Sequence, residues 1–197
     1  MRILVLTINY TPEPTGFAPH VSALCDFMAA RGNSVTVLTG FPWAPYWSRW
    51  SEYRGKIIAR ESINKVQVVR LTHFIPTRPG NALQRIWMEG SFCLMAGVAL
   101  FTELLGTHWD AVLYVGAQPS LAMFARLLST LHRIPYIVAI NDLATQVAAD
   151  VGIISNKILA KILTAFEYFA YNKASGAMVL CDAFRQTLVE HHFPQER

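Results

Sequence analysis

A carboxylate and an amide stand side by side at the end of a short apolar segment. Residues 135–140 (PYIVAI) have the composition of a buried strand, and Asn141 and Asp142 follow directly. Asp142 could accept a hydrogen bond from a ligand hydroxyl or act as a base near a reaction centre. Aspartate is also a common helix cap, so it could simply begin the next helix. Its place at the carboxyl end of a strand slightly favours the functional interpretation.

A second candidate is the loop after the first apolar segment. Residues 2–8 (RILVLTI) predict an interior strand, and the loop 9–17 (NYTPEPTGF) places Gly16 just before a helical pattern. A glycine there lets a ligand approach the backbone closely, and a helix N-terminus offers N–H groups and a positive dipole to a diphosphate. An ordinary proline-rich turn fits the loop equally well.

Several familiar sites are missing from the sequence. There is no GxGxxG after the first strand and no GxxxxGK[ST] anywhere, which disfavours nicotinamide dehydrogenases and P-loop NTPases. The three cysteines, Cys25, Cys93 and Cys181, show no CxxC or Cys/His spacing, so we expect buried, reduced thiols and no metal site. Met1-Arg2 leads straight into a strand without a signal-peptide pattern, which predicts a cytoplasmic location.

The elements that must position these residues alternate along the chain. Strands are predicted at 2–8, 34–39, 66–72, 111–115, 135–140 and 177–181, and helices at 17–31, 81–106, 119–132, 156–174 and 182–191, with a long structured loop at 40–60. This order predicts one α/β domain with a doubly wound, mostly parallel, Rossmann-like sheet of six or seven strands. Ligands of such sheets bind at the carboxyl ends of the strands.

Composition adds a question about membranes. The chain is 53% hydrophobic and only 15% charged, and the segment from Arg49 to Arg85 contains eight basic residues and two acidic ones. Such an excess would favour phosphates or lipid headgroups, although a solvated face fits as well, and no nucleic-acid motif accompanies it. The helix at 81–106 contains an uncharged run, 90–102, too short to cross a bilayer. A buried core helix is the first interpretation, and a helix in the membrane interface is the alternative.

The first 47 residues, from MRILVLTINYTPEPTG to GFPWAPYW, are similar to the opening of glycosyltransferase family 4 proteins, in particular the bacterial exopolysaccharide branch that includes colanic-acid transferases. The shared pattern is a strand, a Tyr-x-Pro-Glu loop ending in glycine, a helix ending in Arg-Gly, a valine-rich strand and a Gly-Phe-Pro turn. Three later segments match in the same order: Tyr46 to Lys56, Asn141-Asp142-Leu143, and Ala165-Phe166-Glu167.

The resemblance implies a GT-B architecture, in which two Rossmann-like domains face each other across a cleft. Residues 1–197 would be the N-terminal, acceptor-side domain, inactive by itself, and the C-terminal donor-binding domain would be absent from this chain. The complete enzyme would retain anomeric configuration without a metal or cofactor. It would move a hexose-type sugar from a nucleotide-sugar donor to a lipid-linked or saccharide acceptor in cell-surface polysaccharide synthesis, in the cytoplasm or at the inner face of the cytoplasmic membrane.

The resemblance also suggests residue roles. Asp142 matches an acidic position that faces the cleft and is our catalytic candidate; Thr15, Gly16 and Phe17 would lie near the donor diphosphate, and His20, Trp43, Gln118 and Asn141 are candidates for acceptor contact. Glu167 matches a family glutamate that could serve packing or an ion pair. The chain departs from the family at Thr15-Gly16, where two glycines are usual, and at Ala144-Thr145, where Trp-Pro is usual.

Two other functions stay open from the sequence. The first is a non-catalytic, membrane-surface binding module on the same fold, which would use the basic cluster and the apolar helix. The second is a nicotinamide-dependent reductase, which the missing GxGxxG disfavours.

Overall fold

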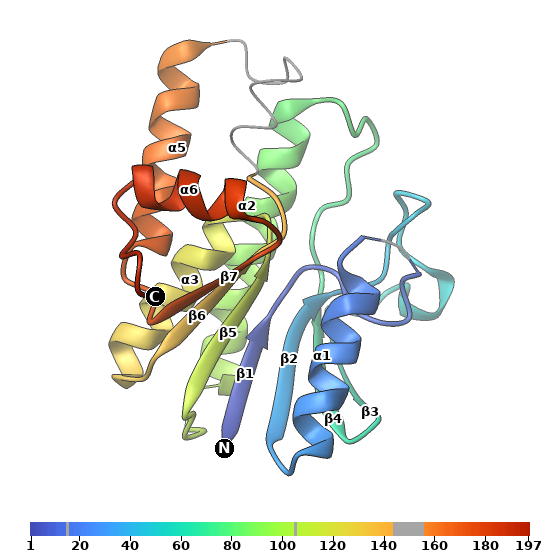
Figure 1. Ribbon diagram of the computed structural model, residues 1–197. Coiled ribbons are helices and arrows are strands. Elements are labelled where there is room, and N and C mark those ends of the chain that lie inside the picture. The colour runs from blue at the N-terminus through green and yellow to red at the C-terminus, as the bar shows by residue number, and fades with distance from the viewer. Residues whose placement is uncertain (15, 105, 144–155) are drawn as a thin grey trace.

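The structure, a computed structural model, describes residues 1–14, 16–104, 106–143 and 156–197. Seven strands form one sheet in the order β3-β4-β2-β1-β5-β6-β7 (Figure 1). They are β1 (Arg2–Leu6), β2 (Ser34–Gly40), β3 (Ile58–Ile63), β4 (Val66–Leu71), β5 (Ala111–Gly116), β6 (Tyr136–Ile140) and β7 (Gly176–Val179). Only the pairing of β3 with β4 is antiparallel. The predicted doubly wound, mostly parallel sheet is therefore confirmed.

The central strands are buried on both faces, which explains why they read as continuous apolar runs. Val5 of β1 is fully buried and lies opposite Val37 of β2 and Leu113 of β5. Val5 belongs to the core on one face of the sheet, whereas its neighbours Leu4 and Leu6 belong to the core on the other. Alternate residues of one strand thus hold both layers of helices.

Strand β3 corrects the sequence interpretation, which had extended the loop as far as residue 60. The loop ends at Ile57, after a short 3-10 turn, η1 (Ser51–Tyr53). Asn64 and Lys65 then form a two-residue hairpin turn with φ of 49° and 68°. β3 was not predicted because it is an edge strand with alternating, partly charged side chains and has no apolar run.

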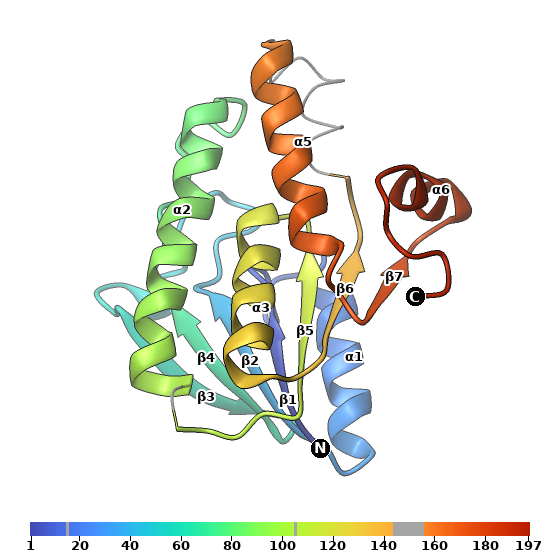
Figure 2. The same cartoon turned by 90° about the vertical axis from the view of Figure 1, so that its left-hand side faces the viewer.

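Helices cover both faces of the sheet (Figures 1 and 2). α1 (Ala18–Ala30) packs on one face, in the same core cluster as β2 and β4. On the other face lie α2 (Ala82–Ala99), its π-helical continuation η2 (Leu100–Leu104), α3 (Pro119–His132) and α5 (Lys157–Tyr171), and α6 (Asp182–Glu190) lies beside β7. These helices agree with the predicted ones within a few residues.

Two burial predictions were only partly right. α2 is a core helix on one side only, through Met88, Phe92, Ala96 and Ala99. All three cysteines are free, but only Cys25 is buried, while Cys181 is exposed.

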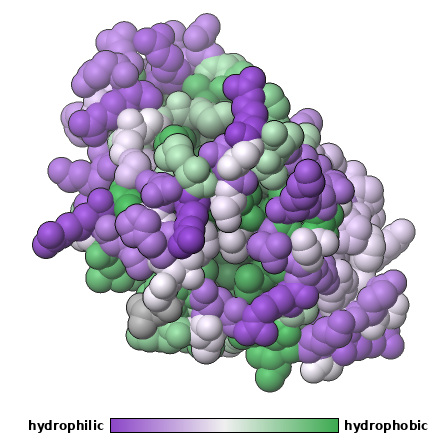
Figure 3. All heavy atoms as spheres, turned by 90° about the horizontal axis from the view of Figure 1, so that it is seen from below, coloured by the Kyte–Doolittle hydropathy of each residue, from purple (hydrophilic) through white to green (hydrophobic). Residues whose placement is uncertain are grey.

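At the amino ends of the strands, polar and apolar residues are interspersed over the surface (Figure 3).

The strand order changes direction between β1 and β5. From β1 the chain builds outward through β2 and β4, and from β5 it builds the opposite way through β6 and β7. At such a point the loops that leave neighbouring strands turn to opposite faces and leave a crevice between them. The fold therefore directs attention to the carboxyl ends of β1 and β5.

Candidate functional site at the carboxyl edge of the sheet

The residues predicted from the sequence come from four neighbouring strands. Trp43 follows β2, Gly16 follows β1, Gln118 follows β5, and Asn141 and Asp142 follow β6. β2, β1, β5 and β6 are adjacent and parallel, so their carboxyl ends lie at one edge of the sheet (Figure 1). The sheet thus gathers these loops in one row, and the direction change falls between Gly16 and Gln118.

Gly16 has an exposed backbone in a left-handed conformation. Its φ is 64°, and a Cβ added there would meet no atom within 4 Å. Glycine is therefore needed for the backbone angle and not for packing. Phe17 is the N-cap of α1 and is half-buried against the core, and no side chain among the described residues caps that helix start. A helix start without a side-chain cap leaves backbone N–H groups of the first turn without an intrahelical partner. Thr15 lies outside the described residues.

Glu13 fixes the shape of this loop. Its carboxylate is 3% exposed and accepts hydrogen bonds from the backbone N–H groups of Trp43 (2.9 Å) and Ala44 (2.8 Å) through one oxygen. The other oxygen accepts from Asn9 Nδ2 (3.0 Å) and from the Tyr10 N–H (3.3 Å). One buried carboxylate thus joins the loop after β1 to the loop after β2, because a carboxylate can accept several hydrogen bonds at once.

Arg70 also holds the loop after β1 in place, from its position in β4. The residue is fully buried in β4, donates from Nε to Glu61 Oε2 at 2.8 Å, and donates from Nη2 to the Thr11 carbonyl at 2.5 Å. The Thr11 N–H in turn donates to Ser22 Oγ of α1 at 3.1 Å. Arg70 therefore does not belong to the basic surface that the sequence predicted, and its charge is neutralised by Glu61.

Trp43 and His20 occupy very different surroundings. The Trp43 ring is 8% exposed and packs against Trp47, with centroids 4.5 Å apart. Its backbone is the part that meets the loop after β1, through Glu13. His20 is exposed in the first turn of α1. Contact of either residue with an acceptor remains a prediction.

Gln118 turns inward from the start of α3. Its Oε1 lies 2.8 Å from where a Cβ on Gly116 would be, and the Tyr114 hydroxyl lies 3.6 Å from the same point. Both the Gln118 oxygen and the fully buried Tyr114 hydroxyl have no hydrogen-bond partner within the described residues. The end of β5 thus carries unsatisfied polar atoms next to the direction change.

A cluster of polar side chains lies under this loop, between α2, α3 and α5. Ser120 donates to Glu89 Oε2 at 3.1 Å, and Tyr171 donates to Glu167 Oε1 at 3.1 Å. Burial raises the pKa of Glu89 to about 7; the Glu167 carboxylate adds to the rise, while Ser120 and Arg85 oppose it. Burial likewise raises the pKa of Tyr171 well above its ordinary value. Glu167 is thus part of a polar cluster, in agreement with a packing role.

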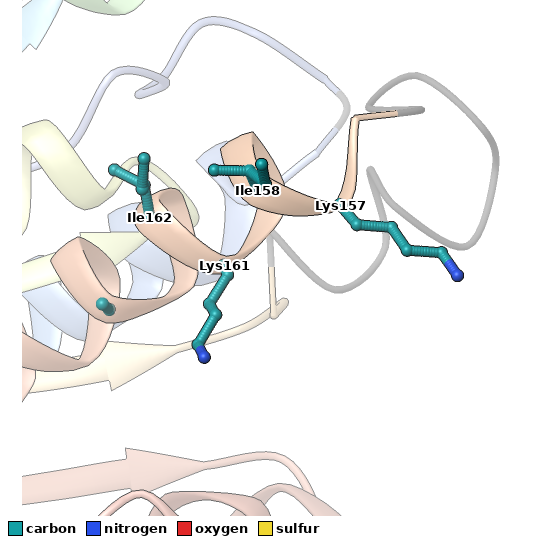
Figure 4. Close-up of a pocket in the computed structure, with 5 residues that line it drawn as sticks. Lys157, Ile158, Lys161 and Ile162 are labelled. Atoms are coloured by element: carbon teal, nitrogen blue, oxygen red, sulfur yellow. The ribbon is translucent and has the colours of Figure 1, made fainter.

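Asn141 and Asp142 are half-buried at the end of β6. Neither side chain makes a hydrogen bond to the other described residues. The prediction that Asp142 could cap a helix concerns residues 144–155, which lie outside the described residues. The same segment includes Ala144-Thr145, where the chain departs from the family pattern. A shallow hollow of about 470 Å³ lies on α5 (Figure 4), and its lining among the described residues is Lys157, Ile158, Lys161, Ile162 and Ala165 of that one helix.

Sequence reasoning missed the two carboxylates that organise this edge. Glu13 was visible only as part of the Tyr-x-Pro-Glu pattern, and its partners in the loop after β2, Trp43 and Ala44, are 30 and 31 residues away. Glu89 had a clearer signal, because it is the one charged residue between Arg85 and Glu103 in a very apolar helix. In the part of the chain that the structure describes, no group of three or more His, Cys, Asp or Glu side chains could hold a metal ion.

Together these features define an α/β domain of Rossmann type, with a helix start after β1 and, two strands away on the same edge, a carboxylate that makes no hydrogen bond to the described residues. A model of the glycosyl transferase 4-like domain matches residues 15–197. The chain belongs to this family, as the sequence resemblance implied.

Known proteins similar to the chain agree with this assignment. It is 29% identical over 195 residues to a protein of Escherichia coli (strain K12) named as a colanic acid biosynthesis glycosyl transferase, WcaI. The match covers 96% of this chain and 47% of that protein, so the chain spans about half the length of the curated relative.

Solved structures show the same fold. UGT89C1 of Arabidopsis thaliana, complexed with UDP, superposes with a TM-score of 0.60 at 14% identity over 100% of this chain and 47% of that one. A UGT transferase of Siraitia grosvenorii in complex with UDP gives 0.51 at 14% identity, over 98% of this chain and 50% of that one. The chain therefore has the fold of a GT-B glycosyltransferase domain.

Proposed function

We propose that the chain is the N-terminal, acceptor-side domain of a retaining glycosyltransferase that acts in cell-surface polysaccharide synthesis. The observation that carries this proposal is the row of loops at the carboxyl ends of β2, β1, β5 and β6, in a chain that belongs to the glycosyl transferase 4-like family. The donor would be a nucleotide sugar of the hexose type, and the acceptor a lipid-linked or saccharide hydroxyl. Neither a metal nor another cofactor takes part.

The open start of α1 suits the leaving group. As the bond between the sugar and the diphosphate breaks, negative charge grows on the diphosphate. The Gly16 backbone, which has no side chain in the way, and the uncapped N–H groups of α1 would stabilise that charge. Phe17 holds the helix start in place by packing against the core. Thr15 remains a candidate of the same loop.

Asp142 suits the acceptor. In the proposed step the acceptor oxygen forms the new bond to the sugar on the face that the diphosphate leaves, and its proton passes to a base. The Asp142 carboxylate, half-buried and without a partner among the described residues, would accept a hydrogen bond from that hydroxyl and orient it. Asn141, Gln118, His20 and Trp43 are the proposed neighbours of the acceptor.

The chain alone is proposed to be inactive, so the test uses the full-length protein. It would be incubated with labelled UDP-hexoses and GDP-hexoses and a bacterial lipid and saccharide extract, with and without EDTA. The proposal expects label to move into the extract with at least one donor, at a rate that EDTA does not change, and with the anomeric configuration of the donor. Absence of transfer across the whole panel would contradict it.

A nicotinamide-dependent reductase remains the weaker alternative, and it makes a different prediction. It requires this domain to bind NAD or NADP through the loop after β1. Calorimetry with both cofactors tests this directly, and the transferase proposal expects no binding heat from either.

A further inference from the structure

A carboxyl group that the proposed reaction does not use lies beside the candidate site. Glu89 stands about two turns into α2, half-buried on the side of the helix that faces α3. Its Oε2 accepts a hydrogen bond from Ser120 Oγ at 3.1 Å, and Ser120 belongs to the first turn of α3. The bond therefore joins α2 to the amino end of α3, at the carboxyl edge of the sheet (Figure 2).

The first turn of α3 carries the backbone of Gln118. Gln118 is the N-cap residue of the helix, and its carbonyl accepts hydrogen bonds from the N–H groups of Leu121 (3.0 Å) and Ala122 (3.2 Å). Pro119 follows it with a fixed φ, so this turn has little freedom of its own. A shift of Ser120 therefore moves Gln118, which lies where the strand order changes direction.

Gln118 holds an amide oxygen that lacks a donor. Its Oε1 is buried and makes no hydrogen bond to the described residues. The residue as a whole is partly exposed, so a rotation of its side chain would bring the amide to the surface. A carbonyl oxygen without a donor is unfavourable in the interior, and a hydroxyl group of a ligand would satisfy it. The amide is thus suited to a hydroxyl-bearing ligand such as a saccharide.

Few charges compensate Glu89. Among the described residues no ion pair includes it. One turn earlier in α2, Arg85 lies with its guanidinium 5.7 Å from the centroid of the Trp47 ring and donates from Nε to the Pro79 carbonyl. The other titratable groups near Glu89 come from α2, β5 and α5: they are Cys93, Tyr114 and Glu167, with Tyr171 bonded to Glu167.

These surroundings keep a proton on Glu89 up to neutral pH. Burial and, to a smaller degree, the Glu167 carboxylate raise the pKa of Glu89 to about 7. Burial also raises the pKa of Cys93 and of Tyr114, so both keep their protons below about pH 8. A neutral Glu89 can pack beside Glu167, whereas an ionised Glu89 would repel it and loosen the contact between α2 and α3.

We propose that Glu89 is a positioning residue of the candidate site: through Ser120 it holds the start of α3 and so places the Gln118 amide for a saccharide hydroxyl of the acceptor. The inference deepens the proposed function and rests on it for the acceptor alone. The hold of Glu89 on α3 weakens as the carboxyl group ionises, so acceptor binding becomes weaker between about pH 6 and pH 8.

The first test needs no ligand and uses the chain by itself. NMR follows the side-chain NH₂ group of Gln118 from pH 6 to pH 8, where its signal should shift with a midpoint near pH 7. The signal should stay constant in Glu89→Gln. In Ser120→Ala, which keeps the carboxyl group but removes the link, it should shift about threefold less. Glu103→Gln is the matched control: it removes the carboxylate of η2 that bonds to Arg60 of β3, and its Gln118 signal should titrate as in the unmodified chain.

The second test uses the full-length protein with the donor that the hexose panel identifies. At pH 6, Glu89→Ala should raise the half-saturating amount of the acceptor extract about tenfold with little change in kcat, because a displaced Gln118 weakens binding and not the chemical step. Glu89→Gln should restore the value of the unmodified protein and remove its rise toward pH 8. Circular dichroism checks that each variant is folded.

Two results would overturn the inference. One is a Gln118 signal that does not titrate in the unmodified chain, still titrates in Glu89→Gln, or titrates fully in Ser120→Ala, since no link would then run from Glu89 through Ser120. The other is an unchanged half-saturating amount in Glu89→Ala. Absence of transfer with every donor would instead contradict the proposed function, and the NMR result would still decide whether Glu89 holds Gln118.

Discussion

The Glu13 carboxylate lies 2.9 Å from the backbone nitrogen of Trp43 and accepts its hydrogen bond, although thirty residues separate the two in the chain. The same oxygen accepts from the next N–H, that of Ala44. These bonds connect the loop that carries Gly16 with the long loop after β2. The position of the open α1 N-terminus therefore depends on a buried carboxylate that need not touch a ligand.

Glu13→Ala should lower the free energy of unfolding by about 3 kcal/mol, because it leaves several buried N–H donors without an acceptor. Glu13→Gln should cost less, since the amide keeps one oxygen acceptor. Urea unfolding of the chain measures both. Glu52→Ala is the matched control: Glu52 is exposed and bonds only to its neighbour Ser51 at 3.3 Å, so its loss should change little. Equal stability of Glu13→Ala and Glu52→Ala would show that Glu13 does not hold the loops.

Two glycines should respond oppositely to alanine. A Cβ on Gly40, at the end of β2, would lie 2.6 Å from His73 Nε2 and 3.0 Å from the Ile8 carbonyl oxygen. Since His73 is itself buried, Gly40→Ala should destabilise by about 2 kcal/mol. Gly97 of α2 has open space around its Cβ position, so Gly97→Ala should stabilise by about 1 kcal/mol through helix propensity. Thermal and urea unfolding check both, and a stabilised Gly40→Ala would contradict the packing described at this edge.

Glu89 should make the stability of the chain fall as the pH rises. Its pKa is raised from 4.5 to about 7 in the folded chain, so between these values the folded chain keeps a proton that the unfolded chain has lost. The contribution of Glu89 is therefore most favourable below about pH 4.5 and is lost as the pH rises to about 7, by roughly 3 kcal/mol in total.

Glu89→Gln isolates this effect because the amide cannot titrate. As the pH rises from 4.5 to 7.5, the unfolding free energy of the unmodified chain should fall relative to that of the variant. The comparison also cancels the opposite contribution of buried His73, whose pKa is lowered mainly by burial. A difference that stays constant over this range would mean that Glu89 titrates as an exposed glutamate does.

The sequence was sufficient for those elements that local pattern determines. β1 and β5 are apolar because both faces are buried, and α3 begins at Pro119 and ends at His132 as predicted, since proline opens it and Arg133 takes a left-handed conformation after it. The alternation of strands and helices predicted a mostly parallel sheet, whereas the strand order that places Gly16, Gln118 and Asp142 at one edge came from the structure.

Features made by distant contacts could not be predicted in this way. β3 is recognisable only by its pairing with β4, and Arg70 looked like a surface charge until its burial beside Glu61 was seen. The exposure of one apolar side of α2 likewise required the structure, because the sequence of an apolar helix is the same whether one side or both sides are covered. Glu13 and Glu89 matter through partners on other elements, which no local pattern encodes.

The most direct test of the account is the turnover of Asp142→Ala in the full-length protein, with the donor that the hexose panel identifies. We predict that kcat falls about a hundredfold or more, since positioned acid–base groups contribute that much, while the urea midpoint stays unchanged. Asp26→Ala, which removes a carboxylate of α1 bonded only to Asn64 at 3.0 Å, should keep full turnover. Unchanged turnover in Asp142→Ala would contradict the site at the carboxyl ends of β1, β5 and β6.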